Sequence, residues 1–309
     1  MSLPVLTSRV GNTPLRRIEK LATAFPGVEV HAKLEFFNPG GSVKDRAALQ
    51  MVKAGLASGA LKPGTNTLID STSGNTGVAY AWLGAALGFK VALVMPANVS
   101  IARKQISLAY GAELLFSDPM EGSDGAIRHV RKLVEGSPQK YFYPDQYSNE
   151  GNPQAHYEGT GPEIYAQTGG RVTHFICGMG TTGTVMGAGR RLKEYRSDIQ
   201  IIGVEPLEPM HGLEGLKHMD TSLKPGIYEP AALDEKLSVS TDEGWDMAER
   251  LAREEGLLVG YSGGAALAGT LKVAERLHAE GRPGVLVTLF PDRADRYFEP
   301  RPWARSYAW

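Results

Sequence analysis

The feature that most constrains the fold of this chain is a repeated order of apolar strand, glycine-rich loop and helix. Four such loops follow apolar segments, at residues 38–46 (NPGGSVKDR), 71–77 (STSGNTG), 178–184 (GMGTTGT) and 260–264 (GYSGG). Apolar strands followed by helices are typical of parallel sheets that helices cover on both faces. Ligands of such sheets bind at the carboxyl ends of the strands, so these loops are the expected ligand-binding segments.

The same pattern predicts an α/β fold, and a length of 309 residues suits about two domains. Strands are expected at 28–34, 67–70, 90–95, 113–116, 140–143, 172–177, 199–205 and 285–290. Helices are expected at 42–57, 75–87, 101–110, 122–134, 153–168, 184–195, 242–255 and 263–280. The pattern restarts near residue 145, which predicts domains at 1–145 and 146–309. Residues 207–230 lack periodicity and are typical of a lid or a substrate-binding loop.

Composition excludes several classes of function. A net charge of −1 gives no electrostatic case for binding nucleic acid or an anionic membrane. The single cysteine, Cys177, allows no intramolecular disulfide and no multi-cysteine metal site, and the seven histidines lack metal-ligand spacing, so no metal is expected. No apolar run approaches the roughly 18 residues that span a bilayer. The first residues lack the pattern of a signal peptide, so a cytoplasmic protein is expected.

The first loop places Lys44 just after Ser42, a good N-cap residue, and therefore in the first turn of a helix. The positive end of the helix dipole disfavours a second positive charge there and favours the neutral amine that a Schiff base requires. Taken alone, however, this residue is more simply interpreted as a solvated surface lysine.

The other three loops suit anionic groups. Residues 71–77 bring hydroxyls, an amide and free N–H groups to a helix N-terminus, although a capped turn without ligand has the same composition. Residues 178–184 resemble a phosphate cradle and also match the G-x-G-x-x-G spacing of dinucleotide-binding oxidoreductases. Ser262, in the fourth loop, is interpreted first as a helix cap. The mixed-sign run 292–296 is more typical of a solvated face than of a site.

In this order, the loops resemble the cysteine synthase family of fold-type II pyridoxal-phosphate (PLP) enzymes. The resemblance runs from GNTPL at 11–15 to DRADRY at 292–297, nearly the whole chain. Residues 145–147, 156–157, 161–164 and 179–184 resemble its B-type subgroup. The family implies a tryptophan-synthase-β-like fold, with two mostly parallel twisted sheets, PLP in the cleft between the domains, and a segment near 12–38 that crosses to the other domain.

The resemblance also implies roles for individual residues. Lys44 forms the covalent link to PLP and carries the proton at the substrate α-carbon. Asn75 hydrogen-bonds the ring hydroxyl, and Ser262 faces the pyridine nitrogen. The residues implied to hold the phosphate are Gly180, Thr181, Thr182, Gly183 and Thr184. The residues implied to bind the substrate are Thr72, Ser73, Asn75, Thr76 and Gln146.

The implied reaction replaces the β-substituent of O-acetyl-L-serine, or of O-phospho-L-serine, with sulfide or thiosulfate through an aminoacrylate, and the product is L-cysteine. A serine at the pyridine nitrogen makes the ring a weaker electron sink than an aspartate would, which suits direct β-elimination. Lys217 lies where some O-phosphoserine-using relatives carry arginine, and it is hypothesised to meet an anionic leaving group or thiosulfate. A homodimer is expected from the resemblance alone.

Three alternatives stay open. The first is another fold-type II lyase, such as a cystathionine β-synthase or a serine/threonine dehydratase. The second is the dinucleotide-binding oxidoreductase, which leaves the Lys44 and Ser262 loops unexplained. The third is a non-catalytic binding module, which the intact Lys44, Asn75 and Ser262 argue against. The aromatic tail 303–309 is expected to pack, on a dimer partner or over the site.

Overall fold

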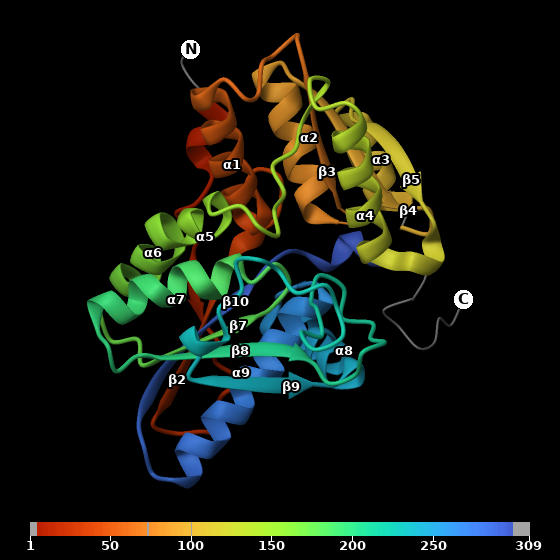
Figure 1. Ribbon diagram of the computed structural model, residues 1–309. Helices are drawn as coiled ribbons and strands as arrows, with labels where there is room; N and C mark the ends of the chain where they lie inside the picture. Colours follow the sequence, from red (N-terminus) through yellow and green to blue (C-terminus); the bar gives the residue numbers. More distant parts are fainter. Residues whose placement is uncertain (1–4, 73, 100, 299–309) are drawn as a thin grey trace.

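Two mainly parallel sheets, each covered by helices, make up this protein, and the predicted α/β class is confirmed (Figure 1). The computed structural model describes residues 5–72, 74–99 and 101–298, without the side chain of Ala102. None of its helices, over this described part, is long and apolar enough to cross a membrane.

The larger sheet has six strands in the order β1-β2-β10-β7-β8-β9. Their bounds are β1 Leu15–Arg17, β2 Val28–Leu34, β7 His174–Gly178, β8 Gln200–Pro206, β9 Glu235–Val239 and β10 Gly284–Phe290. Strand β1 pairs antiparallel with β2, and the remaining neighbours are parallel. All seven residues of β10 are buried, because this apolar strand lies between β2 and β7 and is covered by helix α9.

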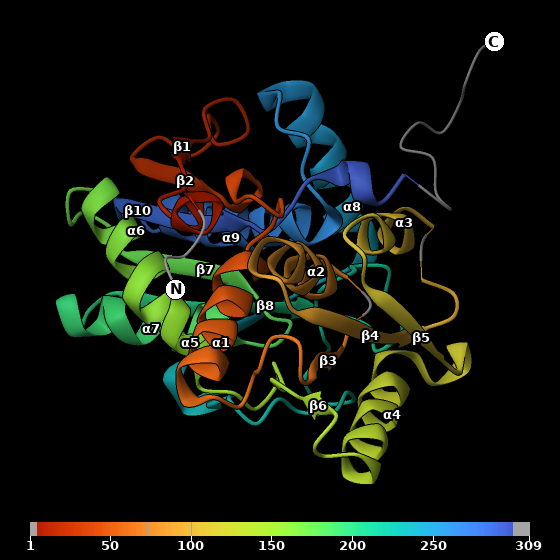
Figure 2. The ribbon, with the colours of Figure 1, turned by 90° about the horizontal axis from the view of Figure 1, so that it is seen from above.

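The smaller sheet has four parallel strands in the order β5-β4-β3-β6. Their bounds are β3 Thr67–Ser71, β4 Lys90–Pro96, β5 Glu113–Ser117 and β6 Tyr141–Phe142. Figure 2 shows helices α2 and α3 on one side of this sheet and α4 on the other.

The α-helices are α1 Lys44–Ser58, α2 Asn75–Leu87, α3 Ile101–Ala109, α4 Gly122–Gly136, α5 Gly151–Ala155, α6 Gly161–Gln167, α7 Gly183–Tyr195, α8 Thr241–Arg250 and α9 Tyr261–Ala279. Five-residue π-helical turns, His156–Thr160 and Leu251–Glu255, continue α5 and α8. Short 3₁₀ turns occupy Val5–Arg9, Glu35–Phe37, Pro119–Glu121, Pro230–Ala232 and Ala294–Arg296.

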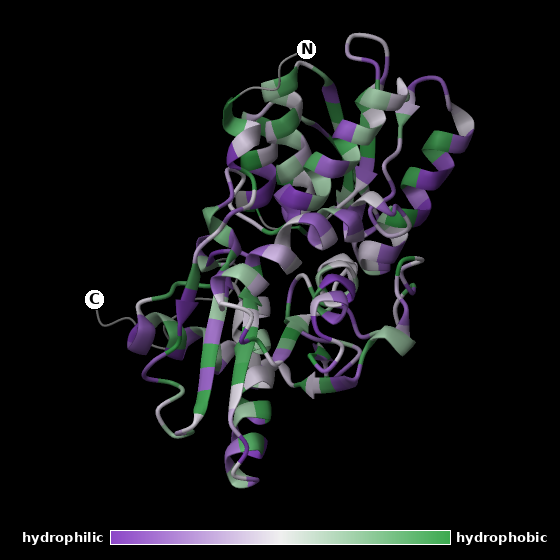
Figure 3. Cartoon of the chain, turned by 90° about the vertical axis from the view of Figure 1, so that its left-hand side faces the viewer, coloured by the Kyte–Doolittle hydropathy of each residue, from purple (hydrophilic) through white to green (hydrophobic). Residues whose placement is uncertain are grey.

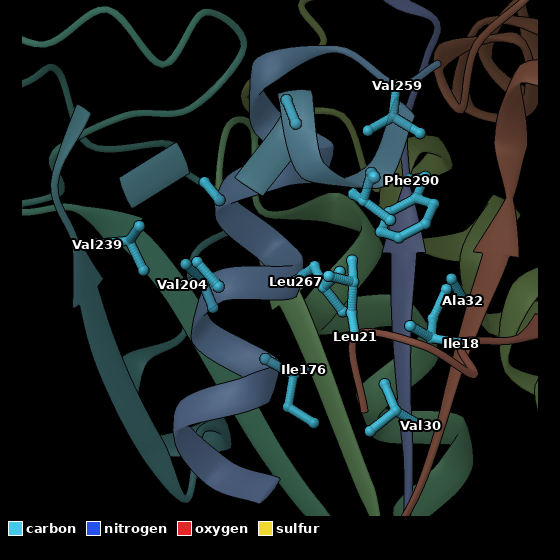
Figure 4. Close-up of a cluster of buried hydrophobic side chains, with 14 of the residues drawn as sticks. Ile18, Leu21, Val30, Ala32, Ile176, Val204, Val239, Val259, Leu267 and Phe290 are labelled. Atoms are coloured by element: carbon cyan, nitrogen blue, oxygen red, sulfur yellow. The ribbon is translucent and has the colours of Figure 1, made fainter. Parts of the chain in front are cut away.

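The largest core cluster lies where α9 crosses the six-stranded sheet. Leu267 of α9, Ile176 of β7 and Val204 of β8 are buried members of this cluster and are labelled in Figure 4. In Figure 3 the buried strands are mostly green, whereas surface helices alternate green and purple, as amphipathic helices do. The apolar segments of the sequence therefore became the inner layers of the fold.

Differences from the sequence-based expectations occur mainly at sheet edges. Strands β1 and β9 were not predicted, because β1 has only three residues and β9 is a half-exposed edge strand that carries charges. The single helix expected at 153–168 is α5, a π-helical turn and α6. Residues 207–229 contain no helix or strand, as expected. Strands β1 and β2 join the larger sheet, while the division into domains near residue 145 stays a prediction.

Candidate active site

A cavity of about 180 Å³ opens between the two sheets, next to the ends of β3 and β7. Eleven of its sixteen lining residues come from three of the four glycine-rich loops and from the segment 214–217. The sixteen are Lys44, Thr72, Gly74, Asn75, Thr76, Arg103, Ser123, Gln146, Tyr147, Gly180, Thr181, Glu214, Gly215, Leu216, Lys217 and Tyr297. The carboxyl ends of parallel strands thus bring together most of the side chains that the sequence singled out.

Lys44 is the first residue of α1, and its side chain lines the cavity. The helix begins two residues later than predicted, with Val43 as the N-cap residue, while Ser42 Oγ accepts the backbone N–H of Lys44 at 3.2 Å. Burial lowers the pKa of Lys44, against the opposing attraction of Asp292. Nζ has no hydrogen bond or ion pair within the described residues, so the amine is free to act as a nucleophile.

The loop after β7 has the features of a phosphate-binding turn. A Cβ atom on Gly180 would lie 2.3 Å from the carbonyl oxygen of Gly215, so only glycine fits there. Thr182 has a left-handed φ of 70°, an unusual conformation for a β-branched residue that is commonest at functional sites. Its buried Oγ1 has no hydrogen-bond partner in the part of the chain described. The loop therefore fits a bound group rich in acceptor oxygens, such as the phosphate of PLP.

Behind this loop, a buried histidine supports Thr184, and the sequence reasoning assigned it no role. His156 Nε2 lies 3.3 Å from Thr184 Oγ1, and His156 Nδ1 lies 2.9 Å from Thr160 Oγ1. Burial lowers the pKa of His156 to about 3, so the ring is neutral near pH 7. The only signal in the sequence was its place in a subgroup motif, since its partners lie 4 and 28 residues away.

The loop after β3 carries a connected set of polar groups. Thr76 Oγ1 donates to Gln146 Oε1 at 2.7 Å, and Gln146 Nε2 donates to the carbonyl oxygen of Ser71 at 2.9 Å. Thr72 Oγ1 accepts the N–H of Gly77 at 3.1 Å. These hydroxyl and amide groups lie at the N-terminus of α2, a suitable place for a carboxylate. Ser73, predicted to join them, lies outside the described residues, as does the aromatic tail 303–309.

Asn75 is held by the segment that follows β10. Its Nδ2 donates to Asp292 Oδ2 at 2.5 Å, and its Oδ1 accepts from Arg296 Nη1 at 2.5 Å. Tyr297 also donates to Asp292, which is fully buried, and burial raises the pKa of that carboxyl. The interpretation of 292–296 as a solvated face is therefore wrong for Asp292 and Arg296. The reason is that Asp292 and Arg296 turn toward Asn75, a residue of the cavity lining, whereas Arg293 and Asp295 are exposed.

Ser262 does not line the cavity, although it is buried in the first turn of α9. Its Oγ lies 4.0 Å from the position of a Cβ atom on Gly215, a lining residue, and it makes no side-chain hydrogen bond to any described residue. Its predicted contact with the pyridine nitrogen stays a prediction. Lys217 does line the cavity, but its Nζ pairs with Asp124 at 3.1 Å.

The chain is similar over nearly its whole length to proteins of one kind. The family model "Pyridoxal-phosphate dependent enzyme" matches residues 6–292. A cysteine synthase of Aquifex aeolicus is 53% identical over 290 residues, which cover 93% of this chain and 88% of the relative. Cysteine synthase B of Pseudomonas aeruginosa is 42% identical, with 96% and 98% covered. The crystal structure of a cysteine synthase (OASS) from Entamoeba histolytica is 34% identical and covers 100% of this chain and 94% of its own, with a TM-score of 0.89.

Proposed function

Because the chain belongs to the cysteine synthase family of pyridoxal-phosphate-dependent enzymes, we propose that the cavity at Lys44 is where it makes L-cysteine. The resemblance inferred from the loops is confirmed, and with it the PLP dependence and the cysteine synthase activity of the O-acetylserine sulfhydrylase type. The roles of single residues remain our assignments, and the free, enclosed amine of Lys44 is the observation that carries them.

We assign the cofactor to residues around the cavity, two of which, Lys44 and Thr182, have side-chain polar groups without a partner among the described residues. Lys44 would bond to the cofactor aldehyde, and residues 180–184, with the unpartnered Thr182 hydroxyl, would hold its phosphate. Asn75 would meet the ring hydroxyl, and Ser262 the pyridine nitrogen. When bound, PLP supplies an electron sink for the negative charge that develops at the substrate α-carbon.

The remaining chemistry belongs to the side chains of this protein. The N-terminus of α2, with Thr72, Thr76 and Gln146, would hold the substrate carboxylate through neutral donors. Lys44 would take the proton from the α-carbon and return it later. The burial that lowers the pKa of Lys44 suits both duties, because a base works best when its pKa lies near the working pH.

A product assay with a matched control tests this assignment. The PLP-loaded protein, given O-acetyl-L-serine and sulfide, is expected to release L-cysteine. Lys44→Ala is expected to lower the rate by about a thousandfold or more, since nucleophile and base are lost together. Lys53→Ala, at an exposed position of the same helix, is expected to keep the rate. An active Lys44→Ala variant, or a wild type that makes no cysteine from acetylated or phosphorylated serine, would refute the proposal.

A homodimer and a cytoplasmic location also belong to this proposal, with the family resemblance as their only support. Light scattering of the purified, PLP-loaded protein would give the mass of the assembly. A monomer would refute the dimer without touching the assignment of Lys44.

A further inference from the structure

The cations that line the cavity form ion pairs with carboxylates, with Lys44 as the exception. The charged lining residues are Lys44, Arg103, Glu214 and Lys217. Arg103 forms an ion pair with Glu214 at 2.5 Å. Lys217 forms one with Asp124, a residue just behind the lining, at 3.1 Å. Beyond Lys44, each lining cation of the described chain therefore has its own carboxylate.

Asp124 holds Lys217 from the opposite side of the cleft. It lies in the first turn of α4, which packs against β3 and β4 of the smaller sheet, whereas Lys217 belongs to the segment after β8 of the larger sheet. Its Oδ1 accepts from Lys217 Nζ, and its Oδ2 accepts the backbone N–H of Leu223 at 3.1 Å. A single carboxylate thus fixes the segment at two points and neutralises its cation.

The Lys217 side chain has little freedom to leave this partner. It is 9% exposed, and Nζ lies 5.1 Å from the centre of the Tyr147 ring. The backbone N–H of Lys217 also donates to the carbonyl oxygen of Met179 at 2.8 Å. The amine therefore stays at the cavity wall with its charge committed to Asp124.

From this pairing we infer that Asp124 determines which activated serine the enzyme uses, by cancelling the charge that a phosphate would need. The inference rests on the proposed function. The substrate carboxylate is assigned to neutral donors, and an acetyl ester brings no further charge. A phosphate ester adds nearly two negative charges, which would lie near the Asp124 carboxylate, and apart from Lys44, which the reaction uses, the lining offers them no uncommitted cation.

The difference in charge between the two substrates grows during the reaction, as the leaving group departs. When the Cβ–O bond breaks, its electron pair leaves with the oxygen, while Lys44 takes the α-proton. Acetate then departs as a monoanion, whereas phosphate departs with at least twice that charge. Asp124 accordingly favours O-acetyl-L-serine over O-phospho-L-serine, and it acts through Lys217 without touching the reacting atoms.

Asp124→Asn tests the inference, because asparagine keeps the shape and can still accept the Leu223 N–H. We expect the ratio of kcat/KM for O-phospho-L-serine to that for O-acetyl-L-serine, both with sulfide, to rise about tenfold. Adding Lys217→Met to Asp124→Asn is expected to return the ratio to the wild-type value. Glu121→Gln is the matched control, since this exposed acid pairs with Arg128 at 2.9 Å and lies outside the cavity lining.

A second measurement does not depend on turnover. Inorganic phosphate, titrated into the PLP-loaded protein by calorimetry, is expected to bind about tenfold more tightly to Asp124→Asn than to wild type. Unchanged phosphate affinity, an unchanged ratio, or an equal fall of both kcat/KM values would overturn the inference and leave Asp124 a support of the segment. If wild type used neither serine, the proposed function would fail, and phosphate binding would still decide the role of Asp124.

Discussion

Lys33 and Lys44 differ in what surrounds the amine. Lys33 in β2 is fully buried, and its Nζ contacts Glu163 at 2.7 Å, the Thr13 carbonyl at 2.5 Å and Gln167 at 3.0 Å. Lys44 lines the cavity without any such partner among the described residues. Burial lowers the pKa of both. Burial alone therefore does not identify a reactive lysine, and the absence of partners separates the candidate from the structural residue.

Lys33 belongs to a network of ion pairs that holds the start of α1, where Lys44 lies. Glu163 also binds Arg46 at 2.7 Å, and Arg46 binds the fully buried Glu35 at 2.7 Å. Burial would raise the pKa of Glu35, but the Arg46 guanidinium holds it below its usual value. Arg46 follows Lys44 by two residues in α1. Compensated charges at the junction of β2, α1 and α6 thus fix the start of the helix that presents the reactive amine.

Replacing each lysine by methionine should have opposite effects on stability. Lys33→Met leaves its partners without their cation and is expected to lower the free energy of unfolding by about 3 kcal/mol. Lys44→Met removes a half-buried amine that has no partner among the described residues, and is expected to raise it by about 1 kcal/mol. Urea unfolding of both variants and wild type, all freed of PLP, measures the two changes. Equal losses in both variants would show that Lys44 is also held by structural partners.

The free energy of unfolding should depend on pH through His156, which lies near the cations of Lys44 and Arg46. Burial lowers its pKa, with Arg46 and Lys44 adding to the effect, to about 3 from an ordinary value of 6.5. Its neutral ring therefore contributes stability that is complete above pH 6.5 and is lost as the pH falls toward 3. The loss from this group is about 1.4 kcal/mol per pH unit within that window.

His156→Gln is expected to remove that part of the pH dependence. The test compares wild type and variant in the slope of the free energy of unfolding against pH. Urea unfolding at several pH values between 6.5 and 4 measures both slopes. Parallel slopes would mean that His156 titrates normally in the folded protein. A steeper slope in the variant would contradict the predicted sign.

Site residues could be proposed from the sequence alone where a single loop carries the whole motif. Lys44 begins a helix, Gly180 and Thr181 follow a strand, and all three line the cavity. The same reasoning failed where partners are distant in sequence. Asp292 is 217 residues from Asn75, and Asp124 is 93 residues from Lys217. Such pairs depend on how two sheets face each other, which no local pattern of charge or hydrophobicity specifies.

The most direct test of the central claim is to trap the bond to the cofactor. Borohydride reduces a C=N bond between an amine and PLP, and mass spectrometry of the peptides then identifies the modified residue. We expect the PLP-loaded protein to carry one pyridoxyl group, on Lys44, and Lys44→Ala to carry none. A label on Lys33 or any other lysine, or an unlabelled wild type, would contradict it.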